Sequence, residues 1–122
     1  MKAYFINAKD ELIVEVDCKD YHHKKELLNC SYIELYPYPI KGNDIWTDEE
    51  ANLKEYNYFF TVDDKVIVSG NAVLLGYDES TGDCKDVSNL DLDSLKSRIT
   101  FMGKRYIDHE KLFSNFKVEE WK

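Results

Sequence analysis

YNYFFTVDDKVIVSGNAVLLG, residues 56–76, carries the strongest strand signal in the chain. It is rich in β-branched and aromatic residues, which favour strands. Asp63-Asp64 and Gly70 divide it, and Asp and Gly favour the turns between strands. We therefore expect two or three strands here, at the centre of a sheet.

Strand patterns also occur on both sides of this segment. Residues 3–16 indicate a β-hairpin and residues 31–36 another strand, because apolar and polar side chains alternate with the period of two of a half-buried strand. Pro37 and Pro39 end the second of these, since proline cannot serve a central ladder. Residues 97–103 indicate a closing strand.

Two segments begin with an aspartate that favours a helix N-terminus. Asp20 can cap a short helix through residue 28, with Lys24 among the residues that face water. Asp108 can cap a final helix over residues 109–117. The chain is therefore expected to combine strands with short helices.

The segment TDEE, residues 47–50, has the spacing of a capping box. It indicates either a short helix toward Tyr56 or a polar hairpin loop. No Pro-, Ser- or Gly-rich linker and no internal repeat divides the chain. We predict an α+β fold for residues 1–122: a single compact domain, mainly antiparallel sheet, with two or three short helices packed on it.

Length and cysteine content limit the class of protein. The chain has 122 residues and three cysteines, an odd number without close pairing. The N-terminus lacks a basic and apolar leader, and no apolar run approaches the roughly 20 residues that span a bilayer. These features predict a reduced, cytoplasmic protein that does not enter a membrane.

The net charge of −8 is distributed unevenly. Residues 43–93 hold thirteen Asp and Glu against three Lys, so this segment carries −10 and the remainder +2. Such a charge repels nucleic acid and attracts basic surfaces. We expect no direct nucleic-acid binding, and a protein partner with a basic surface.

The sequence contains no recognised motif for binding a metal or a phosphate group or for nucleophilic catalysis. Cys18, His22, His23 and Cys30 are zinc-ligand types, but adjacent helical histidines point about 100° apart and the spacing fits no structural zinc pattern. Residues 78–89 are acidic but lack the ligand positions of an EF-hand loop. There is no phosphate-binding glycine loop and no nucleophile elbow. The sequence predicts no metal, no cofactor and no catalytic residues, and it favours a protein that is not an enzyme.

Five segments occur in an order that is similar to a known family: Tyr32–Leu35, Thr47–Lys54, Gly70–Gly76, Gly82-Asp83 and Ile99–Gly103. They resemble a small domain family of unknown function that phages, plasmids and other bacterial mobile elements carry. The resemblance covers about residues 2–103, and residues 104–122 look like a C-terminal helical extension. Ala51 departs from the family pattern, which has glycine there. The family supplies no catalytic residues.

The resemblance and the charge together suggest a small acidic accessory protein of a phage or mobile element. It would bind a host protein, and would inhibit a defence system through an acidic surface that mimics nucleic acid. The predicted contact residues are seven acids and three aromatics: Asp48, Glu49, Glu50, Asp78, Glu79, Asp83, Asp86, Tyr36, Tyr38 and Trp46. The alternative is a small-ligand or nucleotide-binding protein, or an enzyme, with its pocket between sheet and helix.

Overall fold

The computed structural model describes residues 1–107, and all structural statements concern this part of the chain. The predicted helix at 109–117 and its cap Asp108 lie outside the described residues. Strand continues to residue 106, so the first residues of the predicted helical extension are β-structure.

The larger of two sheets has six strands: five follow the order β2-β1-β7-β4-β3, and the short β8 also pairs with β7. All neighbouring strands are antiparallel. Its strands are β1 (Lys2–Asn7), β2 (Leu12–Asp17), β3 (Ile33–Ile40), β4 (Asn43–Asp48), β7 (Ala72–Tyr77) and β8 (Cys84–Lys85). The hairpin expected at residues 3–16 is confirmed as β1 and β2.

A second sheet has three antiparallel strands in the order β6-β5-β9. They are β5 (Tyr56–Val62), β6 (Val66–Ser69) and β9 (Ile99–Tyr106). The segment 56–76 thus forms three strands, but its placement in one sheet was wrong. Gly70 has a positive φ of 82° and follows β6, where the chain leaves the smaller sheet. β7 then enters the middle of the larger sheet, between β1 and β4.

Two α-helices and one short 3₁₀ helix lie among the described residues: α1 (Tyr21–Leu28), α2 (Leu92–Arg98) and η1 (Ala51–Leu53). Asp20 caps α1 as predicted, accepting a hydrogen bond from the His23 backbone N–H (2.9 Å). The capping box expected at 47–50 does not form, because Thr47 is a buried residue of β4 paired with Ala72. The fold is a sheet-rich α+β domain, and none of its described helices is long and apolar enough to cross a bilayer.

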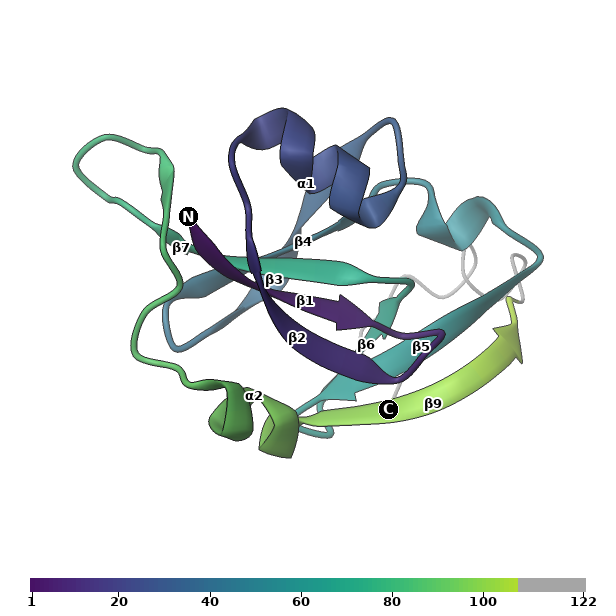
Figure 1. Ribbon diagram of the computed structural model, residues 1–122. Coiled ribbons are helices and arrows are strands. Elements are labelled where there is room, and N and C mark those ends of the chain that lie inside the picture. The colour runs from purple at the N-terminus through teal and green to yellow at the C-terminus, as the bar shows by residue number, and fades with distance from the viewer. Residues whose placement is uncertain (108–122) are drawn as a thin grey trace.

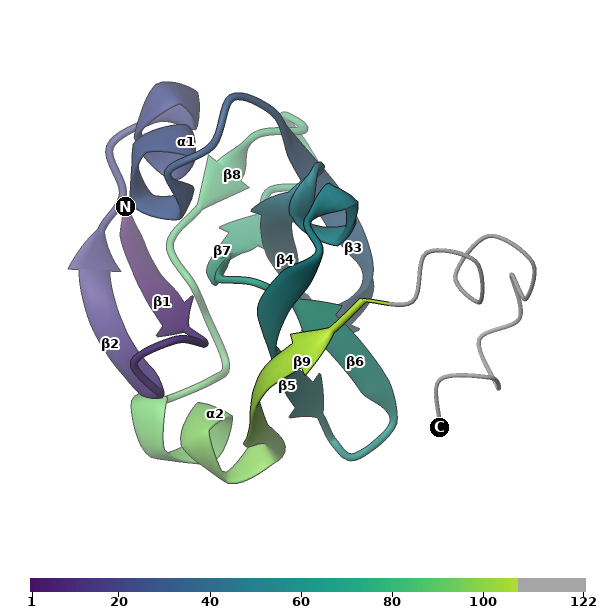
Figure 2. The same cartoon turned by 90° about the vertical axis from the view of Figure 1, so that its right-hand side faces the viewer.

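Alternation along the strands gives the larger sheet two apolar faces. One face contributes Tyr4, Ile6 and Leu74 to a core shared with the smaller sheet and with Leu95 of α2. The other face packs against α1, with Val73 among its buried residues. The two α-helices lie at opposite ends of the molecule in both views (Figures 1 and 2).

The segment after β8 is held tightly against the larger sheet. The Val87 N–H donates to the Lys2 carbonyl (2.9 Å), and the Asn43 side chain pairs with the backbone of Ser88. A Cβ on Gly76 would collide with the backbone carbonyl of Asp86. Glycine at this position therefore allows two backbone segments to approach closely.

Candidate functional site

The predicted acidic residues separate into two groups at opposite ends of the larger sheet. Thr47 pairs with Ala72 and Asn43 pairs with Gly76, so β4 ends where β7 begins. Asp48 is the last residue of β4 and residues 49–50 follow it, whereas residues 78–83 follow the end of β7. In Figure 1 the β7–β8 loop projects at the left, while η1, just after residue 50, lies at the right. The acids do not form one continuous surface.

In the β7–β8 loop, Asp78 organises the turn. Its carboxylate accepts hydrogen bonds from the Ser80 N–H (2.9 Å) and the Ser80 hydroxyl (2.7 Å), and these bonds lower the pKa of Asp78. The Asp83 carbonyl accepts from the Asp78 N–H. Glu79 and Asp83 carry their charges in this exposed turn. Asp78 therefore has a local structural role.

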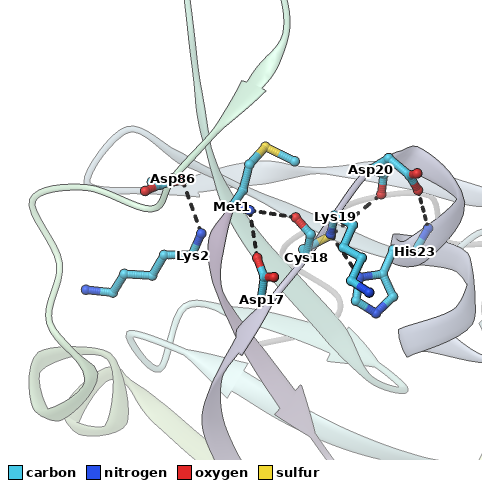
Figure 3. Close-up of polar contacts among 8 residues, drawn as sticks. All are labelled: Met1, Lys2, Asp17, Cys18, Lys19, Asp20, His23 and Asp86. Carbon is cyan, nitrogen blue, oxygen red and sulfur yellow. Dashed lines mark hydrogen bonds and ion pairs between the residues drawn. The ribbon is translucent and has the colours of Figure 1, made fainter.

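Asp86 and the N-terminus form a separate set of polar contacts (Figure 3). The Asp86 carboxylate accepts from the Lys2 N–H (3.1 Å), which fastens the segment after β8 to β1. The Met1 ammonium pairs with Asp17 (2.9 Å) on β2. Asp86 thus belongs to neither acidic group.

The second acidic group gains a residue that the sequence did not indicate. Glu34 on β3 pairs with Thr47, next to the pair formed by Ile33 and Asp48. Partial burial raises the pKa of Glu34, and the charges of Glu49 and Asp48 raise it further. We call Glu34, Asp48, Glu49 and Glu50 the acidic edge. A prediction of the β3–β4 register would have identified Glu34.

Exposed apolar side chains border the acidic edge. Tyr32 is 59% exposed, Leu35 50% and Leu53 65%. The Glu49 N–H donates to the Tyr32 carbonyl (3.1 Å), so this tyrosine directly adjoins the acids. β3 is the outer strand of the larger sheet, which leaves one of its sides open. Tyr32 therefore adjoins the acids directly, whereas Leu35, which pairs with Trp46, lies on the opposite face of β3 from Glu34.

Tyr36 and Tyr38, predicted as contact residues, are built into the fold. The Tyr36 hydroxyl donates to the Ile67 carbonyl (2.9 Å). The Tyr38 hydroxyl donates to the Asp63 carboxylate (2.8 Å), which also receives a hydrogen bond from Arg98 (3.3 Å). Both tyrosines pack against the main core. Both are partly buried and join β3 to the smaller sheet, so they also have a structural role.

Trp46, the third predicted aromatic contact, lies beneath α1. The Lys24 ammonium sits 3.9 Å from the centroid of the Trp46 ring. Lys24 was expected to face water but is only 3% exposed. The Trp46 indole nitrogen is buried and has no hydrogen-bond partner among the described residues. Trp46 is therefore part of the contact between helix and sheet.

The interface between α1 and the larger sheet bears on the alternative prediction of a ligand pocket. Val73 and Leu75 of the sheet pack here with Leu28 of α1, and all three are buried. Lys24 and Trp46 fill a further part of the interface. Packed side chains thus line this interface, and the ligand pocket stays a prediction from the sequence. Within residues 1–107, no three or more His, Cys, Asp or Glu side chains are grouped to hold a metal ion.

Comparisons with protein-family profiles, with curated proteins and with solved structures give no match to this chain. The resemblance to a mobile-element family stays a prediction from the sequence. The functional argument rests on the acidic edge and its apolar border.

Proposed function

We propose that the protein is a binding module whose acidic edge contacts a basic surface on another protein. The observation that carries this proposal is the position of Glu34. Glu34 is an exposed residue of β3, and partial desolvation of its carboxyl, together with the charges of Glu49 and Asp48, raises its pKa. No ion pair joins any of the four edge acids to a cation in the described part of the chain. Within residues 1–107 these like charges are thus kept together without an ion-pair partner, although the Asp48 carboxylate accepts a hydrogen bond from the Glu50 N–H (2.9 Å).

A basic partner would relieve this repulsion. Its Lys or Arg side chains would supply the missing counter-charges, and charge complementarity would steer the encounter. Tyr32, Leu35 and Leu53 would add apolar contact area around the acids. The charges of Asp48, Lys25 and Lys54 all act on the Cys30 thiol, so the two lysines offset part of the charge near Asp48. The contact with the partner therefore centres on Glu34 and Glu49. Binding should weaken as salt rises, since exposed charges are screened over about 8 Å at physiological ionic strength.

The class of partner follows from the sequence resemblance. We propose a host protein, encountered in the cytoplasm by an accessory protein of a phage or mobile element, with a component of a defence system as the target. The edge carboxylates would take the positions of nucleic-acid phosphates in a basic groove of that target. The support for this step is the segment order over residues 2–103 and the acidic edge itself.

Affinity capture with matched charge variants tests the acidic edge. The first variant carries Glu34→Gln and Glu49→Gln. The control carries Glu79→Gln and Asp83→Asn, which removes the same charge from the β7–β8 loop at the other end of the sheet. Each tagged protein is incubated with bacterial lysate at low salt, and affinities for a captured protein are then measured by calorimetry.

We expect the wild type and the loop variant to capture the same protein with similar affinity. The edge variant should bind it about tenfold more weakly, equivalent to about 1.4 kcal/mol. Wild-type affinity should also fall with added salt. The proposal fails if the wild type captures nothing at low salt, or if the edge and loop variants lose affinity equally.

A further inference from the structure

A lysine of α1 and a cysteine of β8 meet beneath α1. The Lys24 ammonium on α1 lies 3.3 Å from the Cys84 sulfur on β8, sixty positions along the chain. Lys24 is 3% exposed, whereas Cys84 is only partly buried. The Lys24 ammonium nitrogen also lies over two aromatic rings, 3.9 Å from the centroid of Trp46 and 5.2 Å from the centroid of Tyr21.

The environment of Lys24 is unusual for a buried amine. Buried charges are ordinarily paired with an opposite charge, because leaving water is costly. Here, within residues 1–107, no carboxylate lies within ion-pair distance of Lys24, although its charge acts on the Asp44 carboxylate of β4. Its hydrogen-bond partner is the sulfur of Cys84. The two aromatic faces hold the ammonium in place. The fold thus holds the Lys24 nitrogen, which becomes a nucleophile once it loses its extra proton, in contact with one particular sulfur.

An oxidant can reach that sulfur. β8 is a two-residue strand that pairs with the last two residues of β7, Gly76 and Tyr77, and Cys84 keeps part of its surface exposed. Cysteines that are open to solvent and beside a cation are those most readily oxidised. The adjacent amine then offers the oxidised sulfur a partner for condensation.

We propose that Lys24 and Cys84 form a covalent sulfur–nitrogen crosslink when hydrogen peroxide oxidises the protein. In the first step the Cys84 sulfur attacks the peroxide. A sulfur–oxygen bond forms as the oxygen–oxygen bond breaks, giving a sulfenic acid and one water. Sulfur is oxidised by two electrons and the peroxide is reduced.

In the second step the Lys24 nitrogen, having released its extra proton to solvent, attacks the sulfenic sulfur. The sulfur–nitrogen bond forms while the sulfur–oxygen bond breaks. The departing hydroxide takes the remaining proton lost by the amine and leaves as a second water. One thiol, one amine and one peroxide thus give a sulfenamide and two waters. The link joins α1 to β8, whose residues are distant in the chain.

Cys18 is the competitor for this reaction. The charges of both Lys24 and Cys84 affect the pKa of the Cys18 thiol, so Cys18 lies close to both. A Cys18–Cys84 disulfide is therefore the alternative product. Cys18 is fully buried, and burial raises the pKa of its thiol, which disfavours the reactive thiolate. The hydrogen bond at 3.3 Å gives Lys24 the advantage of position.

Peptide mapping by mass spectrometry under non-reducing conditions tests the proposal on the full chain after treatment with one equivalent of hydrogen peroxide. We expect a peptide containing Lys24 to be joined to one containing Cys84. The joined mass should be lighter than the sum of the two peptides by two hydrogen atoms, and a thiol reductant should release the link. Cys18→Ser and Cys30→Ser should leave the link intact.

Lys24→Met keeps an apolar side chain of similar length and removes the amine, so it should abolish the link and leave Cys84 as an unlinked oxidised thiol. Circular dichroism checks that this variant folds. If it does not, the maps of the wild type and of Cys18→Ser decide the question alone. A Cys18–Cys84 disulfide, or an oxidised Cys84 beside unmodified Lys24 in the wild type, would overturn the proposal.

Discussion

Asn43 connects three parts of the backbone through one buried side chain. Its amide nitrogen donates to the carbonyls of Ile40 (3.0 Å) and Ser88 (2.7 Å), while its amide oxygen accepts from the Ser88 N–H (2.9 Å). Asn43→Ala would leave these buried groups without partners. We expect the free energy of unfolding to fall by about 2–4 kcal/mol. Urea denaturation followed by circular dichroism measures the change.

Asn7 provides a matched control at the turn between β1 and β2. Its side chain makes two hydrogen bonds, both to Asp10, and they are exposed to solvent. Asn7→Ala should lower the free energy of unfolding by less than about 1 kcal/mol. Equal losses for the two variants would show that the network around Asn43 has no special role.

Single residues show where prediction from the sequence ended. The cap at Asp20 was predictable, because its hydrogen bond is formed with a residue three positions away. Tyr36 and Tyr38 bond to Ile67 and Asp63, about thirty residues distant. Those contacts depend on how the two sheets pack, and no local pattern encodes that packing. The same reason explains why Lys24 was misplaced.

At the scale of elements, α2 depends on its N-terminal cap. The Asp91 carboxylate accepts a hydrogen bond from the Ser94 N–H (2.7 Å), and this bond lowers the pKa of Asp91 below 3.8. A lowered folded-state pKa means that the carboxylate stabilises the fold above pH 3.8 and loses this effect as the pH falls through the folded value. Asp91→Ala should therefore lower the thermal midpoint at neutral pH. The difference from the wild type should narrow in acid.

The variant Asp91→Ser distinguishes the effect of the capping hydrogen bond from the effect of protonating the Asp91 carboxyl. Serine retains an oxygen that can accept the Ser94 N–H but has no carboxyl to protonate. Thermal melts of both variants and the wild type, from neutral pH down to below the folded pKa, give the comparison. Asp91→Ser should melt near the wild type at neutral pH. A deficit in Asp91→Ala that persists unchanged into acid would contradict the assigned role of the carboxylate.

Elements could be predicted where their signal is local. Alternation identified β1 and β2, and the Asp20 cap identified α1. The TDEE segment had a competing signal, and strand pairing prevailed because Thr47 is buried between its partners on β3 and β7. The division of residues 56–76 between two sheets was not predictable, since β7 takes its place by pairing with β1 and β4.

At the scale of the whole molecule, the topology determines where the charge lies. The acidic segment 43–93 extends from β4 to α2 and passes through both sheets. Its acids therefore reach opposite ends of the larger sheet, although they are concentrated in the sequence. The excess charge was visible in the sequence, but its separation into the acidic edge and the β7–β8 loop depends on strand register.

The two sheets share one core, so they should unfold together. Val68 on β6 is 1% exposed and packs in that core, whereas Trp46 lies on the far face of the larger sheet, under α1. In a Trp121→Phe background Trp46 is the remaining tryptophan of the chain, and its fluorescence reports on this distant face. Val68→Ala should lower the free energy of unfolding by about 1–3 kcal/mol.

Val68→Ala should also move the urea midpoints of Trp46 fluorescence and far-UV circular dichroism equally. Leu53→Ala, at a side chain 65% exposed, should move neither midpoint appreciably. If Val68→Ala shifts the dichroism but not the fluorescence, the smaller sheet unfolds on its own and the shared core does not couple the two.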